Sequence, residues 1–250
     1  TRLLRQRTAR KDYDGVFLKW LLQTYYTEMI EHLYILPILL FSIVVHEVAH
    51  AWVALRCGDD TAKELGRLTL NPIPHIDLVG SILIPLLSIA STGTVYIAWA
   101  KPVPVNPNNF ANYKRDDVLV SIAGPLSNIL IAFGCSVGLA CTLLATSLFG
   151  DAPTQSTEQL FSFFTQMFHA GIYLNIFLAV FNMIPLPPLD GSHVLAAVLP
   201  DAIANKFRSA GFLGLIVVIL FMRIDAVNVA MFSLVHALAM PLEYLVSLVV

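Results

Sequence analysis

Charged residues are scarce in this sequence: Asp, Glu, Lys and Arg make up 13% of its 250 residues, and the formal net charge is -2. Hydrophobic residues make up 57%, and the mean hydropathy is +0.73. This composition excludes an ordinary soluble domain and predicts that the lipid bilayer surrounds most of the chain. No stretch joins a basic cluster to the aromatic pattern of a nucleic-acid reader, so nucleic acid is not an expected partner.

Cysteine is also scarce, with three residues in the chain. Cys57, Cys135 and Cys141 lack the spacing of a metal site, and the last two point in different directions on one apolar helix. We therefore interpret all three as packing residues. The N-terminal residues lack the basic, apolar and small-residue order of a cleavable signal peptide, so none is expected.

Long apolar runs are what the sequence has in place of charge. A helix that spans the hydrocarbon core needs about 20 mostly apolar residues. We expect an all-α polytopic membrane protein with about five or six transmembrane helices. The candidate helices cover residues 33–55, 118–148, 161–184, 212–222 (a short one) and 227–250.

A further apolar stretch, residues 78–100, is interrupted by Gly80, Pro85 and Gly93. It could span the membrane, or re-enter as a loop or short β-hairpin. The connections between apolar runs are too short for extra folded domains, so residues 33–250 are predicted to form one intramembrane domain. Residues 1–32 begin with several Arg and Lys residues and are predicted to form a juxtamembrane, interfacial segment.

The segment His46-Glu47-Val48-Ala49-His50 lies inside the first apolar run. On a helix, His46 and His50 leave the same face and can bind one divalent metal ion, with Glu47 beside them to accept a proton from water. A carboxylate at bilayer depth costs about 2.5 kcal/mol or more, so the cluster needs a compensating purpose. The pattern predicts a catalytic metal site.

A catalytic zinc site typically has three protein ligands, so a third must come from elsewhere. The best donor is Asp190, which follows the prolines Pro185, Pro187 and Pro188 at the end of a predicted helix. Its alternative role is that of an N-cap for a helix starting near Ser192. His193 is a rival ligand.

Three motifs together resemble the site-2 proteases, a family of intramembrane zinc metalloproteases. They are the His46 to His50 segment, Gly124-Pro-Leu-Ser-Asn128, and Asn182 leading through prolines to Leu189-Asp190-Gly191. The runs Gly66-Arg-Leu-Thr-Leu-Asn-Pro and Ala98-Trp-Ala-Lys-Pro-Val-Pro-Val-Asn-Pro are similar to the compact prokaryotic branch that lacks PDZ and CBS domains. Ala98 departs from that branch, which usually has Gly before the Trp.

The resemblance implies regulated cleavage of transmembrane proteins or peptides in a prokaryotic plasma membrane. It also implies one Zn2+ per chain, held by His46, His50 and Asp190, with Glu47 as general base and acid. Asn128 would then hydrogen-bond the oxyanion or the substrate backbone. An interhelical hydrogen bond is the equally weighted alternative for Asn128.

For one metal to bind both motifs, the helix with His46 and the helix before Asp190 must run parallel. Residues 78–100 should therefore re-enter rather than span, because a span there would separate the ligands by much of the bilayer. The basic residues of the loops then share one face, which the positive-inside rule makes cytoplasmic. The side on which the basic N-terminus lies stays open.

A helical substrate must be unwound before its peptide bonds can be attacked. Residues 94–97 and 103–105 are rich in β-formers, and we expect this stretch to pair with the unwound substrate by strand addition. The alternative is a proline-rich membrane loop.

The competing function is a membrane metal-ion transporter or channel, since His and Asp in mid-membrane also mark ion pathways. No second half of the sequence resembles the first, as inverted repeats would require. Substrate identity and oligomeric state cannot be predicted from the sequence.

Overall fold

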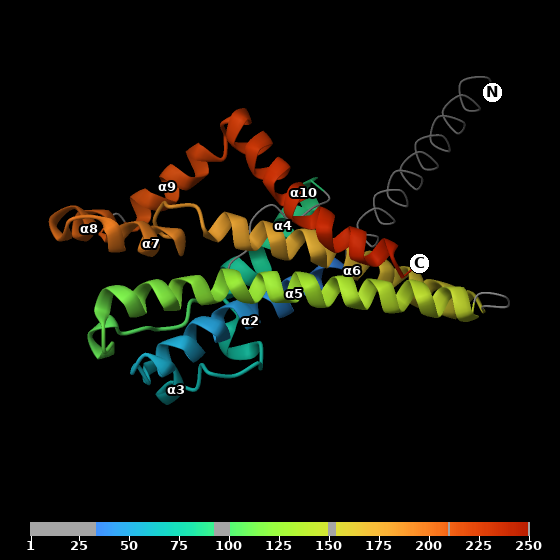
Figure 1. Cartoon of the computed structure of the whole chain (residues 1–250), viewed down its shortest axis with the longest axis horizontal. Coiled ribbons are helices and arrows are strands. Elements are labelled where there is room, and N and C mark those ends of the chain that lie inside the picture. The colour runs from blue at the N-terminus through green and yellow to red at the C-terminus, as the bar shows by residue number, and fades with distance from the viewer. Residues whose placement is uncertain (1–33, 93–100, 150–153, 210, 250) are drawn as a thin grey trace, which may run out of the picture.

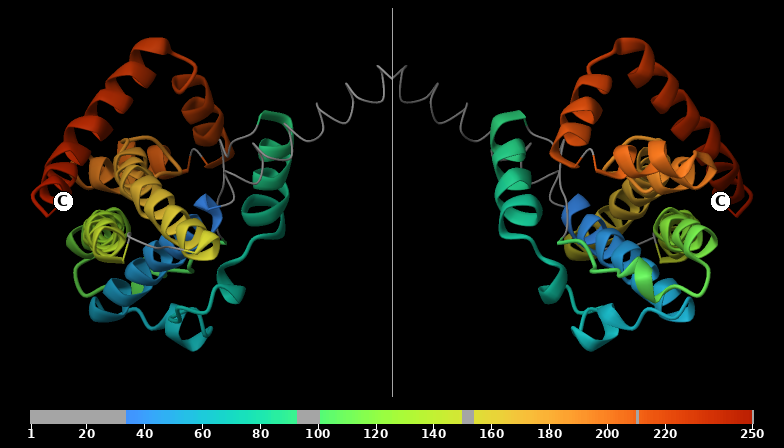
Figure 2. Two further views of the ribbon diagram at one scale, coloured as in Figure 1. Left: turned by 90° about the vertical axis from the view of Figure 1, so that its right-hand side faces the viewer. Right: turned by 90° about the vertical axis from the view of Figure 1, so that its left-hand side faces the viewer.

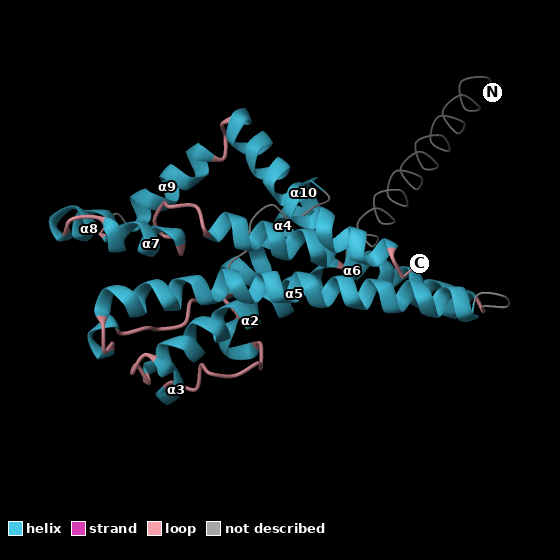
Figure 3. Ribbon diagram, viewed as in Figure 1, coloured by secondary structure: helices cyan, strands magenta, loops and turns pink. Residues whose placement is uncertain are grey.

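The computed structural model describes residues 34–92, 101–149, 154–209 and 211–249. Four helices within them are long and apolar enough to cross a membrane: α2 (Ile35–Arg56), α5 (Tyr113–Phe149), α6 (Gln155–Asn182) and α10 (Asp225–Ser247). The bent pair α8 (Asp201–Arg208) and α9 (Gly211–Phe221) raises this number to five if it forms one span. The described residues contain no strand (Figure 3), so the predicted all-α polytopic class is confirmed.

The shorter elements connect these helices. They are α3 (Thr61–Glu64), a 3₁₀ turn at Ile73–His75, a π-helical segment at Leu78–Leu83, α4 (Ile84–Thr92), a 3₁₀ turn at Pro107–Asn109 and α7 (Gly191–Val198). The predicted interfacial helix at residues 1–32 lies outside the described residues.

Local sequence explains the ends of α2. Pro37 stands in the first turn, where a backbone N–H has no intrahelical partner to lose. The helix ends before Gly58, whose φ of +105° is left-handed. A Cβ at Gly58 would also lie 2.9 Å from the carbonyl oxygen of Asn109, so the chain can turn tightly there only without a side chain.

The core lies where α2, α5, α6 and α10 meet (Figures 1 and 2). Small residues allow close contact: Ala132 and Ala239 are completely buried, and a Cβ on Gly171 would lie 2.7 Å from Cys135 Sγ. Cys135 packs in this core as predicted, whereas Cys57 is half-buried and Cys141 is exposed. Many large apolar side chains face outward, as a bilayer environment requires, among them Leu130, Phe133 and Phe232.

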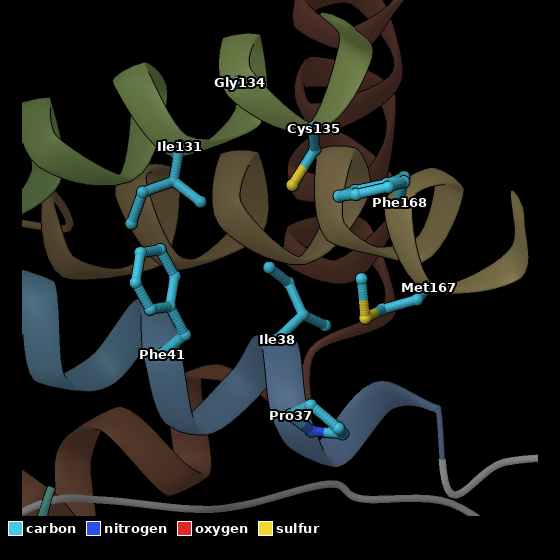
Figure 4. A pocket seen from close by; sticks show the side chains of 8 residues that line it. All are labelled: Pro37, Ile38, Phe41, Ile131, Gly134, Cys135, Met167 and Phe168. Atoms are coloured by element: carbon cyan, nitrogen blue, oxygen red, sulfur yellow. The ribbon is translucent and has the colours of Figure 1, made fainter. Parts of the chain in front are cut away.

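An apolar pocket of about 370 Å³ lies between α2, α5 and α6 (Figure 4). Ile38 and Phe41 of α2 line it together with Ile131 of α5 and Phe168 of α6. Its lining residues include no acidic, basic or histidine side chain, and Cys135 contributes a buried thiol. The pocket therefore offers neither the general base nor the set of ligands that a catalytic metal site needs.

The helix directions agree with the predicted parallel arrangement. In Figure 1, α2 and α6 both run toward the end of the molecule that carries α3, α7 and α8, while α5 runs the opposite way. The segment containing α4 stands beside this bundle (Figure 2). Its two ends lie together, because the Lys101 backbone N–H donates to the His75 carbonyl at 2.9 Å. The residues that flank this stretch are therefore neighbours, which the predicted re-entry requires.

The predicted pairing strand falls partly outside the described residues. Residues 94–97 lie outside the described residues, and residues 103–105 form no strand. Pro102 and Pro104 lack the backbone N–H groups that a strand ladder needs on both sides of Val103. In the structure described here, residues 103–105 therefore match the alternative, a proline-rich loop.

Candidate metal centre

The helical period of α2 places His46 and His50 on one face, and both side chains are buried. Their rings meet edge to face, with centroids 4.6 Å apart. Asp190 arrives from the turn between α6 and α7. The structure therefore brings together the three predicted metal ligands, from segments that are far apart in the sequence.

The distances between the ligand atoms suit one small divalent cation. His46 Nε2 and His50 Nε2 are 3.0 Å apart. Asp190 Oδ2 is 3.2 Å from His46 Nε2, and Asp190 Oδ1 is 3.5 Å from His50 Nε2. A tetrahedral zinc ion with ligands at about 2.0–2.1 Å keeps neighbouring ligand atoms about 3.3 Å apart. The three measured separations bracket that value.

A backbone carbonyl fixes the tautomer of His50 directly. His50 Nδ1 lies 2.7 Å from the carbonyl oxygen of Val120, which can only accept, so Nδ1 carries the proton. His50 Nε2 is therefore an unprotonated nitrogen in the neutral ring, as a metal ligand must be.

Two side-chain amides, those of Asn128 and Asn175, fix the tautomer of His46. The Asn175 Nδ2 amide donates to the Gly171 carbonyl at 2.9 Å, which leaves Asn175 Oδ1 to accept from Asn128 Nδ2 at 3.0 Å. Asn128 Oδ1 must then accept from His46 Nδ1, 2.6 Å away. Both asparagines are completely buried. Each step follows from the fixed carbonyl of Gly171, so the free lone pair of His46 is also on Nε2.

The Nε2 atoms of His46 and His50 and the carboxylate of Asp190 are therefore all hydrogen-bond acceptors, and none of them carries a proton that it could donate to another. Two imidazole lone pairs face the carboxylate of Asp190, whose buried Oδ2 has no hydrogen-bond donor among the described residues. A cation relieves this convergence of lone pairs and negative charge. The residues fit zinc, which favours such nitrogen and oxygen donors.

The alternative roles of Asp190 and His193 are not the ones seen. The Asp190 side chain makes no capping hydrogen bond at the start of α7. His193 is not in the group of converging ligand atoms, and its Nδ1 lies 3.0 Å from Asp117 Oδ1. Asn182 donates to the carbonyl of Leu178 within its own helix.

Glu47 is not among the ligands. Its carboxylate oxygen Oε2 accepts a hydrogen bond from the Val103 backbone N–H at 2.7 Å. Because Glu47 directly follows His46, its side chain starts beside the ligands yet stays available for proton transfer.

Gly124 explains the start of the second motif. A Cβ at this position would lie 2.6 Å from His46 Nε2, and it would also collide with His50 Nε2. Only glycine lets α5 approach the ligand atoms this closely. Asn128 follows one turn later on the same helix face, where it reaches His46 Nδ1.

Sequence reasoning missed Asn175 and the Val120 carbonyl. The available signal for Asn175 was a fully polar amide in an apolar helix, one turn after Gly171. No sequence pattern could indicate the role of the Val120 carbonyl, because every residue has a backbone carbonyl group.

Comparisons with known proteins agree with this site. Residues 34–224 match the model of peptidase family M50. The chain is 42% identical over 187 residues to YwhC of Bacillus subtilis, which is named as a zinc metalloprotease, and the match covers 74% of this chain and 77% of YwhC. It is 29% identical over 201 residues to Rip2 of Mycolicibacterium smegmatis, also named as a zinc metalloprotease, covering 79% of this chain and 69% of Rip2.

No solved structure matches the chain. The family match nevertheless extends over most of the sequence and includes the three candidate ligands His46, His50 and Asp190. The chain therefore belongs to peptidase family M50, the family of the site-2 proteases.

Proposed function

We propose that this membrane-embedded zinc metalloprotease cleaves the transmembrane segments of other proteins, with zinc held by His46, His50 and Asp190 and with Glu47 as general base. Its family membership makes it a zinc-dependent peptidase, and its long apolar helices make it an integral, multi-pass membrane protein. The observation that carries the proposal is the convergence of three unprotonated ligand atoms beside an acidic residue, within a bundle of apolar helices.

Zinc bound there supplies a Lewis acid that polarises the scissile carbonyl and makes water acidic enough to attack near neutral pH. The carboxylate of Glu47 takes the proton from the attacking water. It then passes that proton to the amide nitrogen of the leaving segment. The two imidazoles keep their Nδ1 protons throughout, because Val120 and Asn128 hold them.

We assign Asn128 to the orientation of His46. The sequence predicts a bond from Asn128 to the oxyanion or the substrate, with an interhelical hydrogen bond as its alternative. Two contacts support the interhelical role: the amide oxygen binds His46, and the amide nitrogen binds Asn175 of α6. Mutation of a residue that hydrogen-bonds a metal-bound imidazole typically lowers metal affinity or activity 10- to 100-fold.

We place the metal centre toward the cytoplasmic face of a prokaryotic plasma membrane. Eight of the nine described Lys and Arg residues lie on or near α3, the start of α5 and α8, and Figure 1 shows these elements at one end of the molecule; Arg223, between α9 and α10, is the exception. The positive-inside rule makes this end cytoplasmic. The residues concerned are Arg56, Lys63, Arg67, Lys101, Lys114, Arg115, Lys206 and Arg208.

The transporter or channel alternative gains no support from the family match. The two functions also differ in what they ask of Glu47. A carrier needs ligands that release the ion, whereas a protease needs a base beside ligands that keep it.

The test is a cleavage assay in detergent or proteoliposomes with candidate single-span proteins. Glu47→Gln should retain one zinc per chain and lose cleavage. The matched control is Glu64→Gln, an exposed position on α3, which should keep both. Cleavage that survives Glu47→Gln, or zinc flux that needs the histidines but not Glu47, would contradict the proposal.

A further inference from the structure

Arg67 is a buried cation for which the proposed mechanism has no use. Its side chain belongs to a residue only 8% exposed. Its guanidinium NH2 nitrogen donates to the Lys101 carbonyl at 2.7 Å and contacts the Pro102 carbonyl at 3.4 Å. Among the described residues no carboxylate forms an ion pair with it, and its Nε has no acceptor.

Burying an arginine without an anionic partner is costly, because carbonyl dipoles replace only part of its hydration. A loop could be fixed more cheaply by apolar packing. The role of Arg67 therefore depends on the function of the segment whose carbonyls it binds.

Those carbonyls belong to the segment that contacts Glu47. The segment is held at three points: Arg67 binds its carbonyls, the His75 carbonyl accepts the Lys101 N–H at 2.9 Å, and Glu47 Oε2 accepts the Val103 N–H at 2.7 Å. His75 is itself 1% exposed, with Nε2 2.9 Å from the Thr69 carbonyl. Arg67 and His75 thus hold residues 101–102 in place by hydrogen bonds.

The sequence of the segment makes Val103 its single donor toward Glu47. Pro102 and Pro104 have no backbone N–H, and both restrict the chain on either side of Val103. Asp59 fixes the far end, because its Oδ2 accepts the Asn106 N–H at 2.7 Å. The N–H of Val103 is consequently presented at a defined place.

We infer that Arg67 is a positioning residue for the general base: through residues 101–103 it places the Val103 N–H, which holds one oxygen of Glu47 and aims the other at the attacking water. This inference rests on the proposed function of Glu47. It gives a shared purpose to the two motifs around Gly66-Arg67 and Lys101-Pro102-Val103, which the metal centre does not use.

The contact matters because a glutamate side chain has several rotatable bonds. A displacement of about 1 Å in a reacting group can lower the rate 100-fold. Releasing the Val103 N–H leaves the zinc ligands in place, since none of them contacts Arg67 or residues 101–103 in the bonds seen here. The expected defect is therefore in turnover, not in metal content.

The kinetic test compares Arg67→Met and Arg67→Lys with the wild type, all purified with zinc. Arg67→Met should lower kcat about 10- to 100-fold, with KM changed less than about threefold and one zinc retained. Arg67→Lys, whose ammonium can reach one carbonyl, should fall between. Lys63→Gln, which removes an exposed charge on α3, is the matched control and should match the wild type.

A second measurement needs no turnover. In hydrogen exchange, a peptide over residues 101–105 reports only the Val103 and Val105 amides, because Lys101 becomes its terminal amine and the other two residues are prolines. The Val103 amide should be protected in the wild type and exchange faster in Arg67→Lys and in Glu47→Ala. Arg67→Lys keeps the charge, so this comparison stands even if Arg67→Met does not fold.

The outcomes separate the inference from the function on which it rests. Loss of all Glu47 dependence in the cleavage assay overturns the proposed function, whatever the exchange data show. Glu47-dependent cleavage with an unchanged kcat in both Arg67 variants overturns the inference alone. So does a Val103 amide that exchanges equally in wild type and Arg67→Lys. A raised KM with normal kcat also contradicts it, because the loop would then act on substrate binding.

Discussion

Replacing Gly124 with alanine should impair zinc binding while leaving the fold intact. The added methyl carbon would sit 2.6 Å from both His46 Nε2 and His46 Cε1, and it would also overlap His50 Nε2. Carbon atoms do not approach ring atoms so closely, so the rings must move. Because Asn128 and Val120 hold the opposite sides of the rings, this movement breaks hydrogen bonds or tilts the lone pairs away from the metal.

The size of the effect follows from the crowding. Overpacking of this kind typically costs about 1–3 kcal/mol. If the metal-bound state bears that cost, the Kd for zinc rises about 5- to 150-fold. Alanine is also better than glycine inside a helix by about 1 kcal/mol, which offsets part of the strain in the zinc-free protein. Thermal stability without zinc should therefore change little.

The assay is a zinc competition titration in detergent micelles, with thermal unfolding measured in parallel. Gly134→Ala is the control, since it lies on the same helix and its Cβ would meet no atom within 4 Å. The control should bind zinc as the wild type does. Equal zinc affinity in Gly124→Ala and Gly134→Ala would refute the placement of α5 against the ligands.

Two further predictions concern buried polar groups. Asn175→Leu, which keeps the branched shape of the side chain, should leave Asn128 Nδ2 without an acceptor, at a cost of about 1–3 kcal/mol, and weaken zinc binding about 10- to 100-fold in the same titration; unchanged affinity would exclude the amide chain to His46. Burial raises the pKa of Asp59, but hydrogen bonds from Thr61, Asn106 and Asn109 outweigh burial and leave it lowered. The pKa of an aspartate in the unfolded chain is about 4. The stabilisation by ionised Asp59 is therefore fully present above about pH 4 and is lost as the pH falls below that value toward the lowered pKa of the folded protein. Asp59→Asn should flatten this acid limb in unfolding experiments; an unaltered limb would assign it to other carboxyl groups.

The sequence was sufficient wherever one short-range rule decides the geometry. The helical period alone puts His46 and His50 on one face, and the need for a third ligand points to Asp190 beyond the prolines. The shared metal then requires α2 and α6 to be parallel and the stretch between them to return on its own side. The structure agrees on both points.

The contacts that reach across the fold could not be predicted in this way. Asn175 orients His46 only through Asn128, and Arg67 meets residues 101–102 only because the re-entrant stretch brings the chain back. The expectation of a strand at residues 103–105 gave weight to valine and too little to Pro102 and Pro104, which remove ladder donors. Side-chain partners of this kind depend on tertiary packing.

The most direct test of the central claim is zinc X-ray absorption spectroscopy on the purified Glu47→Gln protein, which should hold the metal without turning over substrate. We predict one zinc per chain with only nitrogen and oxygen neighbours at about 2.0–2.2 Å, including two imidazoles, and loss of this signature in Asp190→Ala. A zinc–sulfur distance of about 2.3 Å, or a spectrum unchanged by Asp190→Ala, would contradict the site.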